Sequence, residues 1–116
     1  MSTTVYGLKN CDTCKKATKW LDRFDVPYTF VDYRENKPSP EMLLEWAAQL
    51  GGLAAMVNKS STTWRQLPDN RQAAASDAEW KLLLREYPQL IKRPVVEWSN
   101  GSVTVGFAPD DWADRG

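Results

Sequence analysis

Histidine is absent from this chain of 116 residues. Its absence excludes catalytic Cys-His and Ser-His pairs, and any zinc or haem site that uses a histidine ligand. Cysteine is scarce, with two residues in all, and two thiols cannot supply the four Cys or His ligands of a structural zinc site. We therefore expect no bound metal, and the sequence has no recognisable motif for a flavin or a nicotinamide cofactor.

Net charge and long apolar runs are also missing. Lysine and arginine number 15, as do aspartate and glutamate, so the composition gives no support for a surface that binds nucleic acid or an anionic membrane. No apolar run is long enough to span a bilayer, and residues 1–4 lack the layout of a signal peptide. We expect one cytoplasmic domain over residues 1–116. Thiols in that compartment stay reduced, so a cysteine pair there is more often catalytic or regulatory than structural.

The two cysteines form a C-x-x-C motif at Cys11 and Cys14, between a short apolar strand and an amphipathic helix. A thiolate at a helix N-terminus is stabilised by unpaired backbone N–H groups and the helix dipole, which lowers its pKa and makes it a nucleophile. The second thiol is near enough to attack a mixed disulfide on the first. The polar neighbours Asn10, Asp12 and Lys15 favour this reading over two buried, inert thiols.

Periodicity predicts a β-α-β unit, a helical block and a β-hairpin. The helix over residues 14–24 places Ala17, Trp20, Leu21 and Phe24 on its apolar face. Four strands are expected at residues 3–6, 28–32, 95–98 and 102–105, with Asn100-Gly101 as the hairpin turn.

The helical block covers about residues 40–91. Ser39 is expected to cap a helix that ends at Gly51-Gly52. Thr62 or Thr63 is expected to cap a short helix that stops at Pro68, and Ser76 begins a capping box. A last helical turn is expected at residues 109–112.

These features together resemble the arsenate reductase/Spx (ArsC-like) family, and the short chain resembles its YffB branch. The resemblance rests on residues 6–17 with the C-x-x-C pair, on the Leu90-Ile91-Lys92-Arg93-Pro94-Val95-Val96 segment, and on Val105-Gly106-Phe107. It implies an α/β, thioredoxin-like fold: a four-stranded mixed sheet with a helical insertion between the second and third strands.

The resemblance also implies roles for individual residues. Cys11 corresponds to the family's nucleophile and Cys14 to its second cysteine, while Arg93 precedes a proline, Pro94, that is expected to be cis and to lie against the Cys11 sulfur. The residues around the motif are expected to contact the substrate: Asn10, Asp12, Thr13 and Lys15. Arg93 and the backbone edge at Pro94 are expected to orient the substrate, although an ion pair with Asp12 is an alternative role for Arg93.

The function predicted from this resemblance is a thiol–disulfide oxidoreductase that works with glutathione as co-substrate. Cys11 would attack a disulfide or a glutathionylated thiol, and Cys14 or a second glutathione would release the product. An arsenate reductase is an alternative, but two of the three arginines that hold the oxyanion in that group would fall near Asn58-Lys59 and at Gly106. Another alternative is an Spx-like redox-sensing regulator that binds RNA polymerase.

Overall fold

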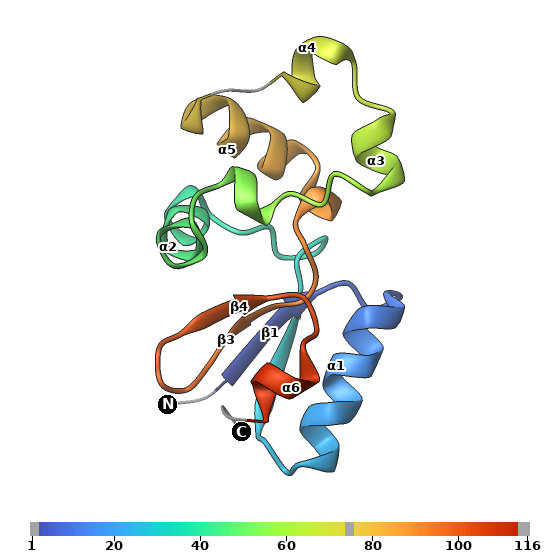
Figure 1. The fold of residues 1–116 in the computed structure, drawn as a ribbon, viewed down its shortest axis with the longest axis vertical. Coiled ribbons are helices and arrows are strands. Elements are labelled where there is room, and N and C mark those ends of the chain that lie inside the picture. The colour runs from blue at the N-terminus through green and yellow to red at the C-terminus, as the bar shows by residue number, and fades with distance from the viewer. Residues whose placement is uncertain (1–2, 74–75, 114–116) are drawn as a thin grey trace. The chain divides into compact units, whose positions relative to one another are not determined.

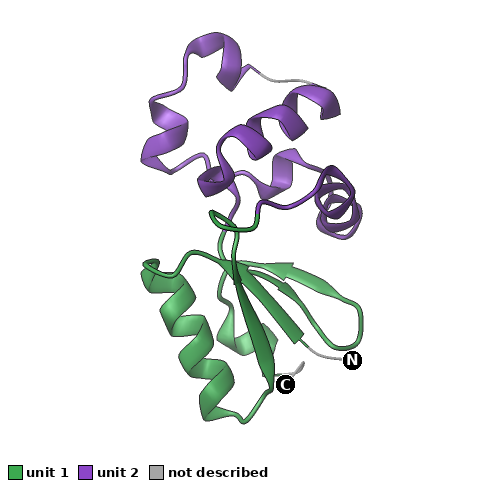
Figure 2. Cartoon of the chain, turned by 180° about the vertical axis from the view of Figure 1, so that it is seen from behind, with its two compact units in different colours: residues 1–36, 93–116 green, residues 37–92 purple. Residues whose placement is uncertain are grey.

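The computed structural model describes residues 3–73 and 76–113. The chain divides into two compact units, which Figure 2 distinguishes by colour. The first unit combines residues 1–36 with residues 93–116, and the second consists of residues 37–92. The second unit therefore covers the predicted helical insertion, with boundaries a few residues outside the expected ones.

The first unit is built on a four-stranded sheet with the order β2-β1-β3-β4 (Figure 1). Its strands are β1 (Thr3–Gly7), β2 (Tyr28–Asp32), β3 (Val95–Glu97) and β4 (Val103–Val105). β1 and β2 are parallel, whereas β1 pairs with β3 and β3 with β4 in the antiparallel sense. The predicted four-stranded mixed sheet is thus confirmed, and so is the Asn100-Gly101 hairpin between β3 and β4.

The core of this unit lies between the sheet and two helices, α1 (Asp12–Arg23) and α6 (Pro109–Trp112). Alternate residues of β1 are buried, as expected for a strand with one covered face. α1 presents small and branched side chains to the sheet at helical spacing. The buried cluster consists of Val5, Ala17, Leu21, Val96, Trp98 and Trp112.

The two ends of α1 differ from the prediction. The helix begins at Asp12, two residues earlier than expected, with Cys11 as its N-cap. At the other end Phe24, which was assigned to the apolar face, is 55% exposed. Phe24 is the C-cap, and Asp25 follows with φ at +56°, so the chain leaves the helical path there and Phe24 turns outward beside Trp20.

The second unit is helical. Its elements are α2 (Pro40–Leu50), η1 (Ala54–Met56), α3 (Thr62–Arg65), α4 (Asp69–Gln72), α5 (Asp77–Glu86) and η2 (Pro88–Leu90). Ser39 caps α2 and Ser76 caps α5, as predicted. Ser61, not Thr62 or Thr63, caps α3, because its hydroxyl accepts the N–H of Trp64. The single short helix expected before Pro68 is also followed by a second one, α4.

Aromatic side chains organise the interior of the second unit. Trp46 is fully buried, and the rings of Trp64 and Trp80 stack with their centroids 5.9 Å apart. The Nζ atom of Lys59 lies over both of these stacked rings. Among the described residues, no helix is long and apolar enough to cross a membrane.

Candidate functional site

Cys11 lies where the loop after β1 becomes α1. Its backbone is extended, and its N–H donates to the carbonyl of Leu8 over 3.2 Å. Its own carbonyl accepts the N–H of Lys15 over 3.0 Å, which is the first hydrogen bond of the helix. The sequence thus places a half-buried thiol directly at the positive end of the α1 dipole.

Four groups act on the Cys11 sulfur. Burial works to raise the pKa of the Cys11 thiol, but hydrogen bonds from the backbone N–H and the thiol of Cys14, the charge of Arg93 and the backbone N–H of Thr13 outweigh it. The pKa of Cys11 therefore lies below its ordinary value. A donor that contacts the thiolate favours that form over the thiol, so the sulfur is activated by its surroundings.

Cys14 has the opposite character. It lies on the inner face of the first turn of α1 and is only 1% exposed. Burial, reinforced by the neighbouring Cys11 sulfur, raises the pKa of Cys14 to about 11. Both cysteines are free thiols in this structure. At neutral pH the pair therefore consists of an activated Cys11 and a protonated Cys14 that donates to it.

Arg93 joins this cluster from the segment that leads into β3. The peptide bond between Arg93 and Pro94 is cis, as predicted, and the Pro94 carbonyl accepts the N–H of Gly106 over 2.9 Å. The guanidinium of Arg93 hydrogen-bonds the Tyr33 hydroxyl and contacts the Cys11 sulfur, and these two groups hold the pKa of Arg93 above its usual range despite partial burial. The topology thus brings residues 11 and 93 together.

Tyr33 is a site residue that sequence reasoning missed. It directly follows β2, and its N–H donates to the carbonyl of Gly7 over 3.1 Å. Its side chain is fully buried, yet its hydroxyl bonds the Arg93 guanidinium. A tyrosine after a strand usually reads as core. Its position directly after the strand that pairs in parallel with β1 was the available signal, because parallel neighbours end at the same sheet edge.

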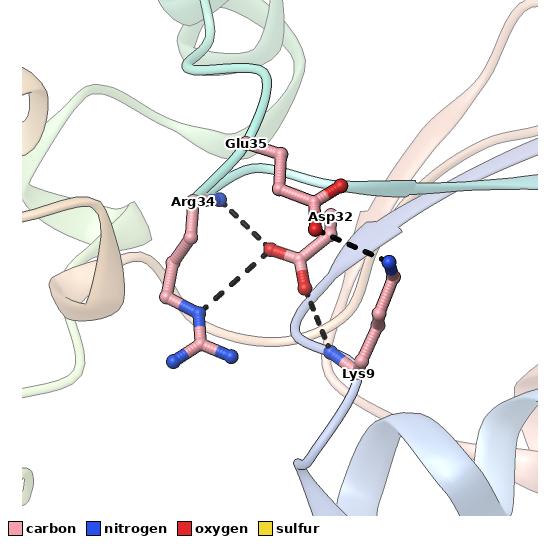
Figure 3. A network of polar contacts seen from close by, with 4 residues as sticks. All are labelled: Lys9, Asp32, Arg34 and Glu35. Carbon is pink, nitrogen blue, oxygen red and sulfur yellow. Dashed lines mark hydrogen bonds and ion pairs between the residues drawn. The ribbon is translucent and has the colours of Figure 1, made fainter.

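Asp32, the last residue of β2, is the second one that was missed. Its carboxylate accepts the N–H of Lys9 over 3.1 Å and the N–H of Arg34 over 2.9 Å, as Figure 3 shows. The Lys9 Nζ atom also pairs with Glu35 over 3.2 Å. Burial acts to raise the pKa of Asp32, but the donors from Arg34 and Lys9 lower it overall. Asp32 therefore fastens the loop that carries Cys11 to the end of β2.

A cavity of about 190 Å³ opens beside Cys14. It lies between the loop before Cys11, the first turns of α1 and the side chain of Phe30 on β2. Lys15, one of the predicted substrate contacts, lines it together with Lys9 and Thr18. Asn10, Asp12 and Thr13 are exposed around the N-terminus of α1, so their predicted substrate contacts stay predictions.

Asn58 and Gly106, where further oxyanion-binding arginines would fall in an arsenate reductase, have different local roles in this structure. Asn58 belongs to the second unit, where its side chain accepts the N–H of Ser60 over 3.0 Å. Gly106 has φ at +79°, a left-handed conformation that favours glycine. Within the described parts of the chain, no group of three or more Cys, Asp or Glu side chains could hold a metal ion.

A thiol on the N-cap of a helix, a second thiol one turn later and an arginine before a cis-proline form one cluster, and the model of one family matches residues 6–114 around it. The chain belongs to the ArsC family. This membership confirms the resemblance that the C-x-x-C and Arg-Pro-Val-Val segments indicated.

Solved structures and sequence relatives agree with this membership. A YFFB protein superposes with a TM-score of 0.90 and is 38% identical, covering 98% of each chain. An arsenate reductase from Vibrio cholerae superposes with a TM-score of 0.83 and is 25% identical, covering 100% of this chain and 98% of its own. The global transcriptional regulator Spx 1 of Bacillus cereus is 24% identical over 93% of this chain and 82% of its own. The likenesses confirm the α/β, thioredoxin-like fold.

Proposed function

We propose that this protein is a thiol–disulfide oxidoreductase that takes its electrons from glutathione. The observation that carries the proposal is the cluster on the Cys11 sulfur: the N–H groups of Thr13 and Cys14, the Cys14 thiol and the charge of Arg93 all favour the thiolate. A half-exposed thiol at a helix N-terminus whose pKa is lowered can attack an incoming disulfide as its thiolate.

The first step is an exchange at sulfur. The Cys11 thiolate attacks the glutathione sulfur of a glutathionylated thiol, R–S–S–G, and forms a Cys11–glutathione disulfide. The S–S bond to R breaks, and R–S⁻ leaves with the electron pair and takes a proton from water. No other oxidant or reductant enters this step, because one disulfide is replaced by another.

A second glutathione completes the cycle. Its thiolate attacks the mixed disulfide and releases oxidised glutathione, which restores the Cys11 thiolate. Cys14 could resolve the same intermediate, but a thiol that is 1% exposed with a pKa of about 11 is seldom a thiolate at neutral pH. We therefore assign Cys14 chiefly to hydrogen-bonding the Cys11 sulfur, and release to glutathione. No bound cofactor is needed.

Two charged residues support the choice of glutathione, which carries two carboxylates. Arg93 lies at the Cys11 sulfur, and Lys15 lines the cavity beside Cys14. A guanidinium that is held in a fixed orientation binds a carboxylate more tightly than a mobile ammonium does. Arg93 is the stronger candidate for a carboxylate contact, and Lys15 the weaker one. A cytoplasmic location, where glutathione is reduced, stays a prediction.

Two other functions are each favoured by one relative. The Vibrio cholerae structure is an arsenate reductase, and an arsenate reductase would use Cys11 to attack arsenic with Arg93 as anion ligand. Spx 1 is a transcriptional regulator, and a regulator would use a Cys11–Cys14 disulfide as a switch toward RNA polymerase. The glutathione reaction remains the main proposal because it needs Arg93, which contacts the Cys11 sulfur, and no further oxyanion ligands.

The test is turnover of a small glutathione mixed disulfide with glutathione as reductant, coupled to glutathione reductase. We expect activity in the wild type, none in Cys11→Ser, and retained activity in Cys14→Ser, whose hydroxyl still donates to the Cys11 sulfur. An inactive wild type would contradict the proposal. An inactive Cys14→Ser would move the resolving step from glutathione to Cys14.

The alternative function as a regulator is tested separately, by a pulldown with RNA polymerase.

A further inference from the structure

The exposed face of α1 carries a basic groove of about 280 Å³, which lies outside the cysteine cluster. Lys16, Lys19, Trp20 and Arg23 line it, and Phe107 closes it from the segment after β4. The four helix residues follow the spacing i, i+3, i+4 and i+7, which places them on adjacent turns of one face. The groove therefore follows the helix axis.

The floor of this groove is aromatic and firmly supported. The ring of fully buried Trp112 contacts Trp20 edge-on with a centroid distance of 5.6 Å, and contacts Phe107 at 5.0 Å. Trp20 also lies against the exposed ring of Phe24, at 4.5 Å. Rings fixed in this way present apolar surface at little cost in side-chain entropy.

The cations on its rim form no ion pair with the residues that the structure describes. Lys16, Lys19 and Arg23 are exposed and take part in none of the ion pairs between described residues. Arg23 contacts the Phe24 ring instead, at 5.9 Å from its centroid. Three cations beside an apolar floor fit a ligand that offers both carboxylates and an apolar side chain. Duplex or single-stranded nucleic acid offers phosphates at regular spacing, and the balanced charge of this chain gives no support for such a ligand.

We propose that the groove binds an acidic segment of the protein substrate, with an apolar side chain of that segment on Trp20 and Phe107. The groove begins at Lys16, about 8 Å along the helix axis from Cys11 at a rise of 1.5 Å per residue. A polypeptide held there can present a nearby glutathionylated cysteine to Cys11. The proposal rests on the proposed function for that last step, and it names the substrate class: glutathionylated proteins with an acidic stretch beside the modified cysteine.

Binding is tested first, without any chemistry. A fluorescein-labelled, cysteine-free peptide with a leucine flanked by glutamates is titrated and its anisotropy measured at low ionic strength. We expect the wild type to bind it, and Lys19→Glu/Arg23→Glu to bind it about tenfold more weakly, with the difference shrinking in high salt. The matched control is Lys37→Glu/Arg85→Glu, two exposed cations of the second unit, which changes the net charge equally and should bind like the wild type.

Three results would overturn the proposal: equal binding of a peptide in which lysines replace the glutamates, equal loss of binding in the control variant, or tighter binding of an oligothymidylate than of the acidic peptide.

A kinetic experiment then compares glutathionylated acidic and basic peptides with a small glutathione mixed disulfide. We expect Lys19→Glu/Arg23→Glu to lose the preference for the acidic peptide and to turn over the small disulfide as the wild type does. If the wild type binds the acidic peptide but reduces no disulfide, the proposed function fails and the groove stands.

Discussion

Gly7 and Cys14 are packed so closely that any larger residue at position 7 must displace the thiol. A Cβ atom built on Gly7 would lie 2.5 Å from the Cys14 Sγ atom, and its other neighbours would be the Cys14 Cβ and a carbon of Phe30, both at 3.6 Å. The first distance is far inside van der Waals contact, whereas 3.6 Å is an ordinary one. The end of β1 thus provides the space that the second cysteine of the motif occupies.

Replacing Gly7 by alanine should therefore destabilise the protein through Cys14. We expect Gly7→Ala to lower the free energy of unfolding by about 1–3 kcal/mol, the usual cost of overpacking a closed site. Chemical denaturation measures this cost. Because Cys14 donates to Cys11, displacement of its thiol should also slow alkylation of Cys11 at neutral pH.

The control for this prediction is a double-mutant cycle. Cys14→Ala removes the Sγ atom that the new Cβ would meet, so adding Gly7→Ala in that background should cost much less. Equal costs in the two backgrounds would mean that the strain lies elsewhere, for example against Phe30.

Asp32 should support stability in a pH-dependent way. Its pKa is lowered in the folded protein, so its contribution is present above the unfolded value of about 3.9 and is lost as the pH falls through the folded value. We expect Asp32→Asn to cost about 1–3 kcal/mol at pH 7, because the single amide oxygen can accept only one of the two N–H groups of Lys9 and Arg34, and that bond is no longer charge-assisted. The difference from the wild type should shrink in strong acid, where the carboxylate charge is lost, as measured by urea denaturation. Glu35→Gln, which alters only an exposed ion pair, is the control.

Much of the fold could be read from the sequence because local signals agreed with one another. Ser39, Ser76 and the Asn100-Gly101 turn each fix a boundary through chemistry that acts over a few residues. Phe24 was misplaced because periodicity takes no account of where a helix ends. Ser61 was passed over because four consecutive hydroxyl residues, at positions 60–63, compete for one cap, and local sequence does not rank them.

The candidate site was only half predictable for a related reason. The C-x-x-C motif is local, and Arg93 was found through its place before Pro94 in a family pattern. Tyr33 bonds Arg93, and Asp32 fastens the loop before Cys11; both roles depend on the parallel pairing of β1 with β2. Nothing in the segment from Tyr28 to Glu35 distinguishes them from ordinary strand-end residues until that pairing is known.

The two thiols should titrate far apart. At pH 7 a Cys14 thiol with a pKa of about 11 is a thiolate in only about one molecule in ten thousand, whereas the pKa of Cys11 is lowered. In single-cysteine variants, the alkylation rate of Cys11 should therefore reach half of its maximum below pH 9, while that of Cys14 still rises toward pH 11. Rates of iodoacetamide modification across this range decide the matter. A faster reaction of the Cys14-only protein at pH 6 would reverse the assignment.

Arsenate should be a poor substrate. Arsenate carries more than one negative charge, and Arg93 is the arginine that reaches Cys11, while Gly106 offers no side chain and a backbone that favours glycine. We expect arsenate turnover, with glutathione and a glutaredoxin supplied, to stay near background in a preparation that reduces a glutathione mixed disulfide. Turnover like that of a dedicated arsenate reductase would instead assign anion binding to Lys59, Arg65 or backbone groups.

Tyr33 should matter through Arg93 alone. Its hydroxyl bonds the guanidinium, so Tyr33→Phe releases Arg93. The KM for a glutathione mixed disulfide should then rise. The pKa of Cys11 should rise as well, because the Arg93 charge is held less firmly at its sulfur. Arg93→Ala should weaken the contact to a glutathione carboxylate by about 1.5–3 kcal/mol, and Arg93→Lys should recover only part. Steady-state kinetics and the pH profile of alkylation measure both effects. Tyr6→Phe, which removes a hydroxyl bonded to Glu97 in the same unit, should change neither.

A double-mutant cycle separates this positioning role from a purely structural one. If Tyr33 works through Arg93, then Tyr33→Phe should have no further effect on KM in the Arg93→Ala background, whatever it does to stability. If the two effects on KM simply add, Tyr33 contacts the substrate or the site independently. A lowered thermal midpoint with unchanged KM in Arg93→Ala would instead favour an ion pair of Arg93 with Asp12, and it would remove Arg93 from the site while leaving Cys11 and Cys14.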